Sequence, residues 1–339
     1  MEQTESPTAK SAAACLICNS SLVLKKFNIK ESMFLTGQTF NYIQCGNCES
    51  LSREEPIVAQ SALYPESYYS LSHNPIEIFN KFIPRFLART MAHSALRGKS
   101  FLLTFIKNIA PKREVRTLAS ILISISRAKK ELPWGPILDV GTGSGMVPYV
   151  LGLDHSDLVI GIDPFATSKT GIATTHSEQK DLHGISGTYD LIMFHHSLEH
   201  VDDIQSTLSA AKERLGSNGR IIIRIPTISS FAWRTYAESW YQLDAPRHRI
   251  IPSRLGLVLL AERCGLSIIH TYDDSTESQF WISEYVLRGL STMDSEKGYL
   301  QFRSAPQSWL KLFAYKRQAK KLNRAHDGDQ TVIVLKRKF

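Results

Sequence analysis

Residues 137–148 have the composition of a loop that binds a nucleotide-like ligand. They read ILDVGTGSGMVP, in which a short apolar strand leads into glycines at 141, 143 and 145. Such glycines let the backbone approach a ligand closely, and Pro148 is tolerated in the first turn of the following helix. Asp163 ends the next apolar run, where a carboxylate can accept hydrogen bonds from both hydroxyls of a ribose. The nicotinamide pattern GxGxxG is excluded, because position 146, where its third glycine would fall, is Met.

Four of the five cysteines form two C-x2-C pairs near the amino terminus. The pairs are CLIC and CGNC, with 26 residues between them, and the ligand set is Cys15, Cys18, Cys45 and Cys48. Two such pairs can hold a structural Zn²⁺ tetrahedrally, and Gly46 is expected to give the second turn backbone freedom. The spacer has room for two strands. Two disulfides are the alternative, and we expect Cys264 to be a reduced core residue.

Three histidines and a glutamate follow an apolar run at 189–194, in the sequence FHHSLEH. Histidine can remove a proton from a hydroxyl group near neutral pH. Among candidate bases, His196 and His248 rank ahead of His200. Glu199 and His200 fall on the next helical turn, so they can equally cap it or pair with neighbours.

Residues 229–248 supply aromatic and polar side chains after another apolar run. Aromatic faces and polar forks suit a carbohydrate or its attached phosphate, so we predict substrate contacts from Trp240, Asp244 and Arg247, the last as a phosphate clamp. The alternative is that the aromatic residues pack as a lid.

The elements that must position these residues alternate between strands and helices. Apolar runs predict strands at 137–140, 158–163, 189–194, 220–225 and 266–272, and a final edge strand at 330–335. The alternation implies an α/β fold with a parallel sheet covered by helices on both faces. We predict a zinc-binding unit at residues 1–62, a basic helical linker at 63–132 and the catalytic domain at 133–339.

The segments GTGSG, FHHSLEH, RIPTISSFAW, WYQLDAPRH and SQFWISEY together resemble a zinc-knuckle-bearing branch of the class I S-adenosylmethionine-dependent methyltransferases, associated with bacterial polysaccharide and sugar biosynthesis. The resemblance implies a Rossmann-like seven-stranded sheet whose last strand inserts antiparallel. It also implies that S-adenosyl-L-methionine is the cofactor. The expected cofactor-binding residues are Asp139, Gly141, Thr142, Gly143, Gly145, Asp163 and His195.

The net charge of +8 is concentrated in residues 73–131, which hold twelve Lys or Arg and three acidic residues. Their helical periodicity fits solvated helices between two domains, or a surface for nucleic acid, anionic lipid or an acidic ligand. The sequence has no run of about 18 apolar residues and no apolar signal segment, so we expect a cytoplasmic protein.

Three functional hypotheses remain. The first is an enzyme that methylates a nucleotide- or lipid-linked sugar or glycan intermediate. The second is an RNA methyltransferase, supported by the zinc unit and the basic segment. The third is a non-catalytic cofactor-binding protein. We expect a small-molecule or glycan acceptor rather than nucleic acid, and leave open a peripheral contact with an anionic membrane surface.

Overall fold

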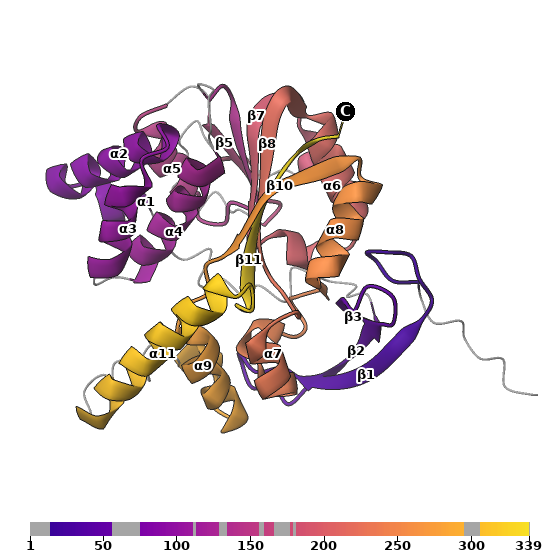
Figure 1. Ribbon diagram of the computed structural model, residues 1–339. Coiled ribbons are helices and arrows are strands. Elements are labelled where there is room, and N and C mark those ends of the chain that lie inside the picture. The colour runs from indigo at the N-terminus through magenta and orange to yellow at the C-terminus, as the bar shows by residue number, and fades with distance from the viewer. Residues whose placement is uncertain are drawn as a thin grey trace, which may run out of the picture.

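A central sheet with helices on both faces forms the body of the protein in this computed structural model (Figure 1). The structure describes residues 14–55, 75–110, 113–128, 134–155, 159–165, 177–178, 181–294 and 306–338. Within these residues the sheet has seven strands in the order β10-β11-β8-β7-β4-β5-β6. The predicted α/β fold is confirmed.

The strands of this sheet are β4 (Ile137–Val140), β5 (Val159–Ile162), β6 (Ser177–Glu178), β7 (Tyr189–His195), β8 (Leu215–Pro226), β10 (Leu266–Asp273) and β11 (Gln330–Arg337). The helices around it are α1 (Pro75–Phe79), α2 (Phe82–Leu96), α3 (Ser100–Ile109), α4 (Arg113–Ala128), α5 (Met146–Gly152), α6 (Ile204–Glu213), α7 (Phe231–Tyr236), α8 (Arg254–Arg263), α9 (Ser278–Leu287) and α11 (Pro306–Arg324). All six predicted strands are present, although residue 158 at the start of one lies outside the described residues.

The position of β11 differs from the sequence prediction. Strands β5, β4, β7 and β8 run parallel, whereas β11 pairs antiparallel with both β8 and β10. The prediction of an edge strand was therefore wrong, and β10 occupies the edge. The first six residues of β11 are all buried, as expected for a strand covered on both faces.

The basic segment is packed on one face of the sheet. Its helices α1, α2 and α4 form one apolar core with α5 and with the strands, in which Leu122 of α4 and Leu191 of β7 are both fully buried. Helices α6 and α8 cover the opposite face. The expected boundary at residues 132 and 133 lies outside the described ranges, as does the whole junction at 63–70. These helices contribute buried residues to the core, and the division of the chain into three units stays a prediction.

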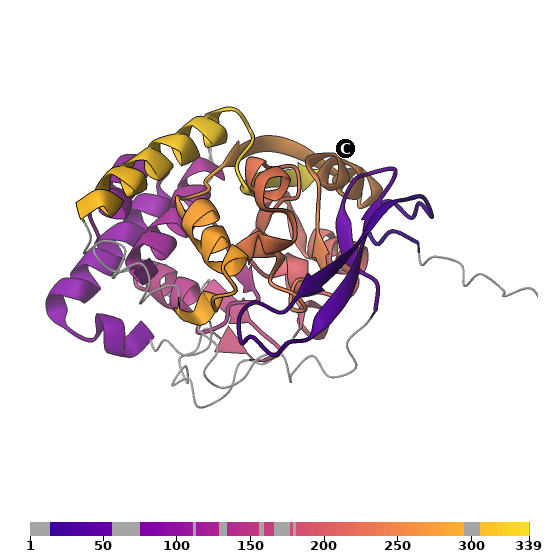
Figure 2. The same cartoon turned by 90° about the horizontal axis from the view of Figure 1, so that it is seen from below.

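A second, four-stranded sheet joins the amino terminus to the body. It consists of β1 (Val23–Lys30), β2 (Thr39–Cys45), β3 (Leu51–Arg53) and β9 (Ile250–Ile251), in that order. The expected strand pair between the cysteine pairs is thus present as β1 and β2. Because β9 follows the predicted substrate segment, the amino-terminal sheet continues into the α/β body. Seen from below, strands β1 and β2 (indigo) and helix α11 (yellow) lie on opposite sides of the molecule (Figure 2).

In the described part of the chain, no helix combines the length and apolar character needed to cross a membrane.

Candidate functional site

The glycine loop connects β4 to α5 at the carboxyl edge of the sheet. Gly141, Gly143 and Gly145 have φ angles of 74°, 55° and 71°, in the left-handed region that favours glycine. The N–H of Gly143 donates to one Asp163 oxygen at 2.9 Å, and the N–H of Phe165 donates to the other at 2.8 Å. The structure therefore brings together the loop and the acidic residue that the sequence paired.

Asp139, in strand β4 directly before the loop, supports it. Its carboxylate accepts a 2.8 Å hydrogen bond from the hydroxyl of Thr142, and its side chain is buried. Burial raises the pKa of Asp139 to about 7, and the nearby charge of Asp163 acts in the same direction. Asp139 and Thr142 thus fix the loop's shape, and their direct contact with a cofactor stays a prediction.

Ser197 joins residues 195–200, which we call the histidine turn, to the glycine loop. Its hydroxyl donates to the carbonyl oxygen of Val140 at 2.6 Å. A Cβ added at Gly141 would lie only 2.3 Å from the Cβ of Ser197. The residues that follow β7 therefore pack directly on the predicted cofactor loop.

His196 is held by Glu199. The backbone of His196 has a φ of 53°, an uncommon value for a non-glycine residue, and its Nδ1 lies 3.1 Å from Glu199 Oε1. Burial raises the pKa of Glu199, but the hydrogen bond with His196 and the nearby histidine charges outweigh it and lower the pKa to about 2. The His196 side chain is 30% exposed, whereas that of Glu199 is fully buried. A buried carboxylate that orients an accessible imidazole is the usual arrangement of a general base.

His200 and His248 lie next to this pair, with ring centroids 4.7 Å apart. His200 Nδ1 is 3.1 Å from the carbonyl oxygen of Arg247, and His248 Nδ1 is 2.8 Å from that of Gln242. Burial, and after it the charge of His200, lower the pKa of His248 to about 4. All three predicted base candidates thus lie around Glu199.

His195 ends β7 with both ring nitrogens buried and without a hydrogen-bond partner among the described residues. Burial lowers its pKa to about 3, and Arg224 adds to this effect. A neutral imidazole with unsatisfied nitrogens at a ligand-binding edge is compatible with the predicted contact to a cofactor.

Two predicted substrate residues have structural roles instead. Trp240 is 1% exposed and donates from Nε1 to Asp329 at 3.1 Å, so its ring offers no face for stacking. Arg247 is 3% exposed and pairs with Asp244 at 2.6 Å and with Glu31 at 3.1 Å. Both predictions are corrected, because the side chains complete buried contacts between distant segments. Asp244 remains beside the site, with one oxygen 3.9 Å from His248 Nε2.

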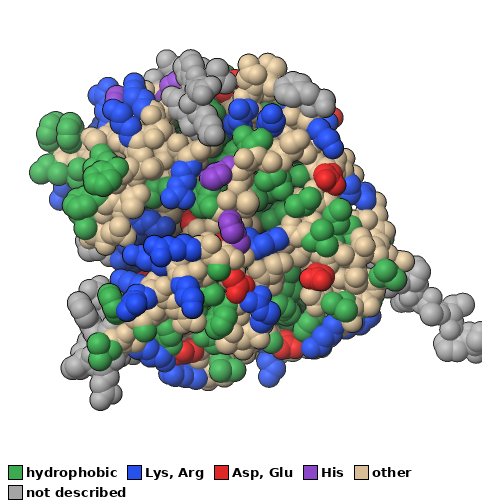
Figure 3. Space-filling view, viewed as in Figure 1, with side chains coloured by type: hydrophobic (Ala, Val, Ile, Leu, Met, Phe, Trp, Pro, Cys, Tyr) green, Lys and Arg blue, Asp and Glu red, His purple; other side chains and the backbone are tan. Residues whose placement is uncertain are grey.

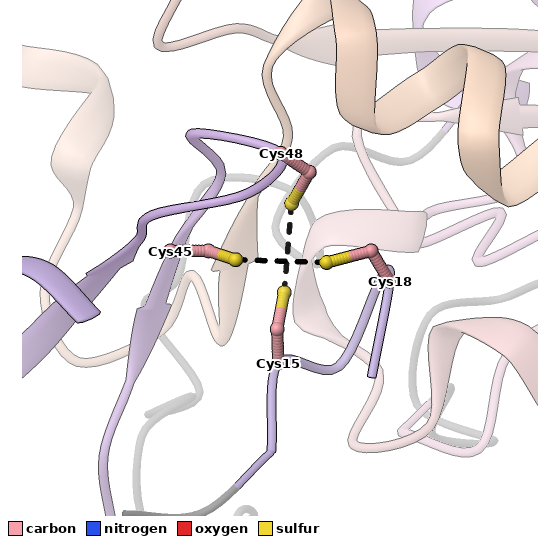
Figure 4. A group of neighbouring side chains, drawn as sticks. All are labelled: Cys15, Cys18, Cys45 and Cys48. Atoms are coloured by element: carbon pink, nitrogen blue, oxygen red, sulfur yellow. Dashed lines mark hydrogen bonds between the residues drawn. The ribbon is translucent and has the colours of Figure 1, made fainter. Parts of the chain in front are cut away.

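The four predicted metal ligands converge on one point (Figure 4). The Sγ atoms of Cys15 and Cys48 are 3.6 Å apart, and those of Cys18 and Cys45 are 3.5 Å apart. Thiolates about 2.3 Å from a tetrahedral Zn²⁺ would be separated by roughly 3.8 Å, so the group fits this ion closely. Hydrogen bonding with Cys15 lowers the pKa of Cys48 to about 5.

The two cysteine turns have the same backbone geometry. In each, the fifth residue donates its N–H to the first cysteine's carbonyl, from Asn19 to Cys15 and from Glu49 to Cys45, and has a φ of 58° or 61°. The expected role of Gly46 was therefore wrong, because the left-handed residue is Glu49. A Cβ at position 46 would instead lie 3.2 Å from Leu22. The repeated pattern CxxCxS at 15–20 and 45–50 is a sequence signal for these paired turns.

Sequence reasoning did not identify two residues that hold the site from the amino-terminal sheet. The hydroxyl of Tyr42 donates to the carbonyl oxygen of His248, and Glu31 pairs with Arg247. No local pattern reveals these contacts, because the partners are about 200 residues apart in the chain. By contrast, the H-x2-E spacing of His196 and Glu199 could have indicated their pairing on one turn.

Residues 87–271 match the model of a family described as "Methyltransferase domain". The match contains the glycine loop, the histidine turn and residues 229–248. No curated protein matches the chain.

Several solved structures are similar to the chain at low identity. One is the O-methyltransferase from a trans-AT PKS multienzyme of Brevibacillus brevis in complex with S-adenosyl-L-homocysteine, with 15% identity, a TM-score of 0.42, and 73% of this chain and 80% of that chain covered. Another is a SAM-dependent methyltransferase from Archaeoglobus fulgidus, with 18% identity, a TM-score of 0.42, and 70% and 100% covered. A third is coclaurine N-methyltransferase bound to N-methylheliamine and SAH, with 14% identity, a TM-score of 0.42, and 68% and 75% covered.

Proposed function

We propose that this chain, which belongs to a family described as "Methyltransferase domain", uses S-adenosylmethionine to methylate a hydroxyl oxygen of a sugar or glycan intermediate. The intermediate would be nucleotide- or lipid-linked and belong to cell-surface polysaccharide or secondary-metabolite biosynthesis. The observation that carries this proposal is the pair of His196 and Glu199, held 3.1 Å apart beside the glycine loop. A hydroxyl acceptor must lose a proton during transfer, and this pair supplies a base.

In the proposed step, His196 Nε2 takes the proton of the acceptor hydroxyl. The oxygen forms a bond to the methyl carbon as the carbon–sulfur bond breaks, and the sulfur keeps the electron pair to give S-adenosylhomocysteine. Glu199 stabilises the resulting imidazolium, because its buried carboxylate is ionised. A positioned general base typically contributes 10²–10⁴-fold in rate.

The cofactor would lie over the glycine loop with its ribose hydroxyls at Asp163. In that arrangement Gly141, Thr142, Gly143, Gly145 and His195 would contact the cofactor. The carboxylate of Asp163 is already oriented by two backbone N–H groups, so little ordering is needed on binding.

The four cysteines would hold a structural Zn²⁺ in this protein. A closed set of four thiolates leaves no open position for a substrate, so the ion would stabilise folding. The cysteine cluster is tied to the segment after β9, since the hydroxyl of Ser253 donates to the carbonyl oxygen of Cys48.

The sugar or glycan class rests on the resemblance of residues 194–200 and 240–248 to the polysaccharide-associated branch. An exposed apolar surface favours a lipid-linked member of that class. On α2, Phe82 is 84% and Phe86 61% exposed, and on α3, Phe101 is 86% exposed. Exposed Lys81, Arg85 and Lys99 lie in the same helices or directly before them.

We therefore propose that α2 and α3 rest on the anionic cytoplasmic surface of a membrane. Apolar side chains flanked by basic ones are typical of helices that bind such surfaces. Hydrophobic side chains project over α2 beside Lys and Arg in the space-filling view (Figure 3).

The test uses a strain that lacks the gene, whose glycolipids and nucleotide sugars serve as acceptors for S-adenosylmethionine carrying a labelled methyl group. We expect the wild-type protein to label one of these fractions, and His196→Ala to lower turnover about a hundredfold with nearly unchanged affinity for S-adenosylhomocysteine. His183→Ala, which changes an exposed histidine away from the site, is the matched control. Label in RNA with a steep salt dependence, and none in glycans, would support the RNA hypothesis instead.

A further inference from the structure

We propose that Glu199, His200 and His248 bind a divalent cation of the Mn²⁺, Fe²⁺, Co²⁺ or Zn²⁺ kind, at a second site separate from the four cysteines. The inference extends the proposed function, because such a cation would hold the acceptor oxygen beside His196. Its binding can nevertheless be tested without methyl transfer.

The first argument is the convergence of the three side chains. Each contributes one possible ligand atom, and these atoms all lie within 4.8 Å of one another. His248 Nε2 is 3.9 Å from the Glu199 carboxylate. A cation about 2.1 Å from each ligand would draw the atoms to roughly 3–3.5 Å, so a contraction on the order of 1 Å completes the site.

The second argument is the orientation of the two imidazoles. The Nδ1 atoms of His200 and His248 each face a backbone carbonyl oxygen, which only accepts hydrogen bonds. In the neutral form of each ring the proton would therefore sit on Nδ1, which leaves the lone pair of Nε2 for a metal ion. Backbone carbonyls fix metal-binding histidines in this way in known sites.

The third argument is an unsatisfied carboxylate. Glu199 is completely buried, and its Oε2 has no hydrogen-bond partner among the described residues. A buried carboxylate oxygen without a partner is costly. A carboxylate oxygen of Glu199 and one ring nitrogen each of His200 and His248 lie close together here. A cation bound between them would offset the repulsion between their lone pairs.

The donor atoms indicate the class of cation. Two imidazole nitrogens and one carboxylate oxygen form the set, and the Asp244 carboxylate is 3.9 Å from His248 Nε2 as a possible fourth ligand. Imidazole donors favour transition metals over Ca²⁺ and Mg²⁺. The set contains no sulfur, so it differs chemically from the four-cysteine site.

The mechanism gains a specific role for such a cation. An acceptor hydroxyl bound to such a cation would lose its proton more readily, and His196, whose Nδ1 lies 3.1 Å from Glu199 Oε1, would receive that proton. The reaction balance is unchanged, because the cation neither gains nor loses electrons.

The experiment titrates Mn²⁺, and separately Co²⁺, into the full-length protein after its zinc content has been measured. Binding of Mn²⁺ is followed by loss of the free-ion signal in electron paramagnetic resonance. Mn²⁺ prefers oxygen and nitrogen ligands and competes poorly for thiolates, so it reports the second site. We expect about one bound Mn²⁺ or Co²⁺ per chain in addition to the zinc.

Two ligand variants and one control test the assignment. Glu199→Gln and His200→Ala should each weaken binding of the added cation at least tenfold, with the zinc content unchanged. His183→Ala should bind like the wild type. Thermal unfolding identifies any variant that is not folded, and two independent ligands keep the test decisive if one variant fails.

Failure of this inference is distinguishable from failure of the proposed function. If neither Mn²⁺ nor Co²⁺ binds beyond the zinc, or if folded ligand variants bind as tightly as the wild type, the site is refuted even where methyl transfer is observed. Cation binding that depends on Glu199 and His200, without transfer to any glycan acceptor, would support the site and remove the proposed substrate class.

Discussion

The hydroxyl of Tyr42 on β2 donates a 2.7 Å hydrogen bond to the backbone carbonyl oxygen of His248. Tyr42 is fully buried, and burial raises its pKa, so the hydroxyl stays protonated and remains a donor at neutral pH. The amino-terminal sheet therefore directly holds the backbone of a residue in the candidate site.

Tyr42→Phe should lower the free energy of unfolding by about 1–3 kcal/mol, because the buried carbonyl oxygen of His248 loses this donor. Denaturant unfolding measures the change, and zinc content should stay the same. Tyr285→Phe removes a hydroxyl from α9 and serves as the control. Equal stabilities of the wild type and Tyr42→Phe would show that the hydrogen bond contributes nothing to the fold.

Metal analysis should find a zinc ion held by the four cysteines. Cys45→Ser should lose that ion and reduce stability or solubility more than it reduces the turnover of the remaining folded protein. Cys264→Ser is the matched control, because its thiol is also buried but lies outside the cluster. Freshly purified protein without zinc would contradict the prediction, as would a stable Cys45→Ser variant without activity.

Asp163→Ala should weaken binding of S-adenosylhomocysteine by on the order of tenfold or more. The carboxylate is expected to bind the ribose, and it also accepts the N–H of Gly143, so its removal disturbs the loop as well as the contact. Isothermal titration measures the affinity, with Asp181→Ala in a separate 3₁₀ turn as the control. Unchanged affinity would remove Asp163 from the binding site.

Asp139 should make stability depend on pH in the absence of cofactor. Its pKa in the folded protein is about 7, above the value near 3.9 expected in the unfolded chain. The folded form therefore binds the extra proton, and the stabilisation is present at low pH and lost as pH rises through 7. The loss is at most about 1.4 kcal/mol per pH unit.

The measurement is denaturant unfolding of the wild type and of Asp139→Asn between pH 5.5 and 8.5. The contributions of the other titrating groups cancel in the difference between the two free energies of unfolding. We expect the wild type to lose stability relative to the variant up to about pH 7, with a constant difference above it. A difference that is constant over the whole range would show that Asp139 titrates normally.

The exposed phenylalanines of α2 and α3 should support binding to anionic vesicles. The double variant Phe82→Ser, Phe101→Ser should reduce sedimentation with phosphatidylglycerol vesicles at least tenfold, since each buried phenylalanine contributes about 1.5–3 kcal/mol. Leu287→Ser is the control, because Leu287 is 65% exposed on α9. Equal binding to neutral phosphatidylcholine vesicles would argue against an electrostatic contribution, and no binding to either would refute the membrane surface.

Features encoded by neighbouring residues were predictable from sequence. The glycine loop requires left-handed backbone at fixed positions, and the paired cysteines require two short turns, so both are visible as local spacing. The strands were found because a buried strand needs a continuous apolar run, which leaves a direct signal in the composition.

Features decided by partners far apart in the chain were not predictable. The apolar character of β11 shows that it is buried, but only the tertiary structure shows that it lies between β8 and β10. Trp240 and Arg247 have the side chains of ligand-binding residues, yet each contacts a distant acidic residue, Asp329 or Glu31, and is buried there. A side chain's chemistry is set by its type, which the sequence gives directly. Whether that chemistry faces a ligand or completes the core depends on which distant segment packs against it, and this only the folded chain decides.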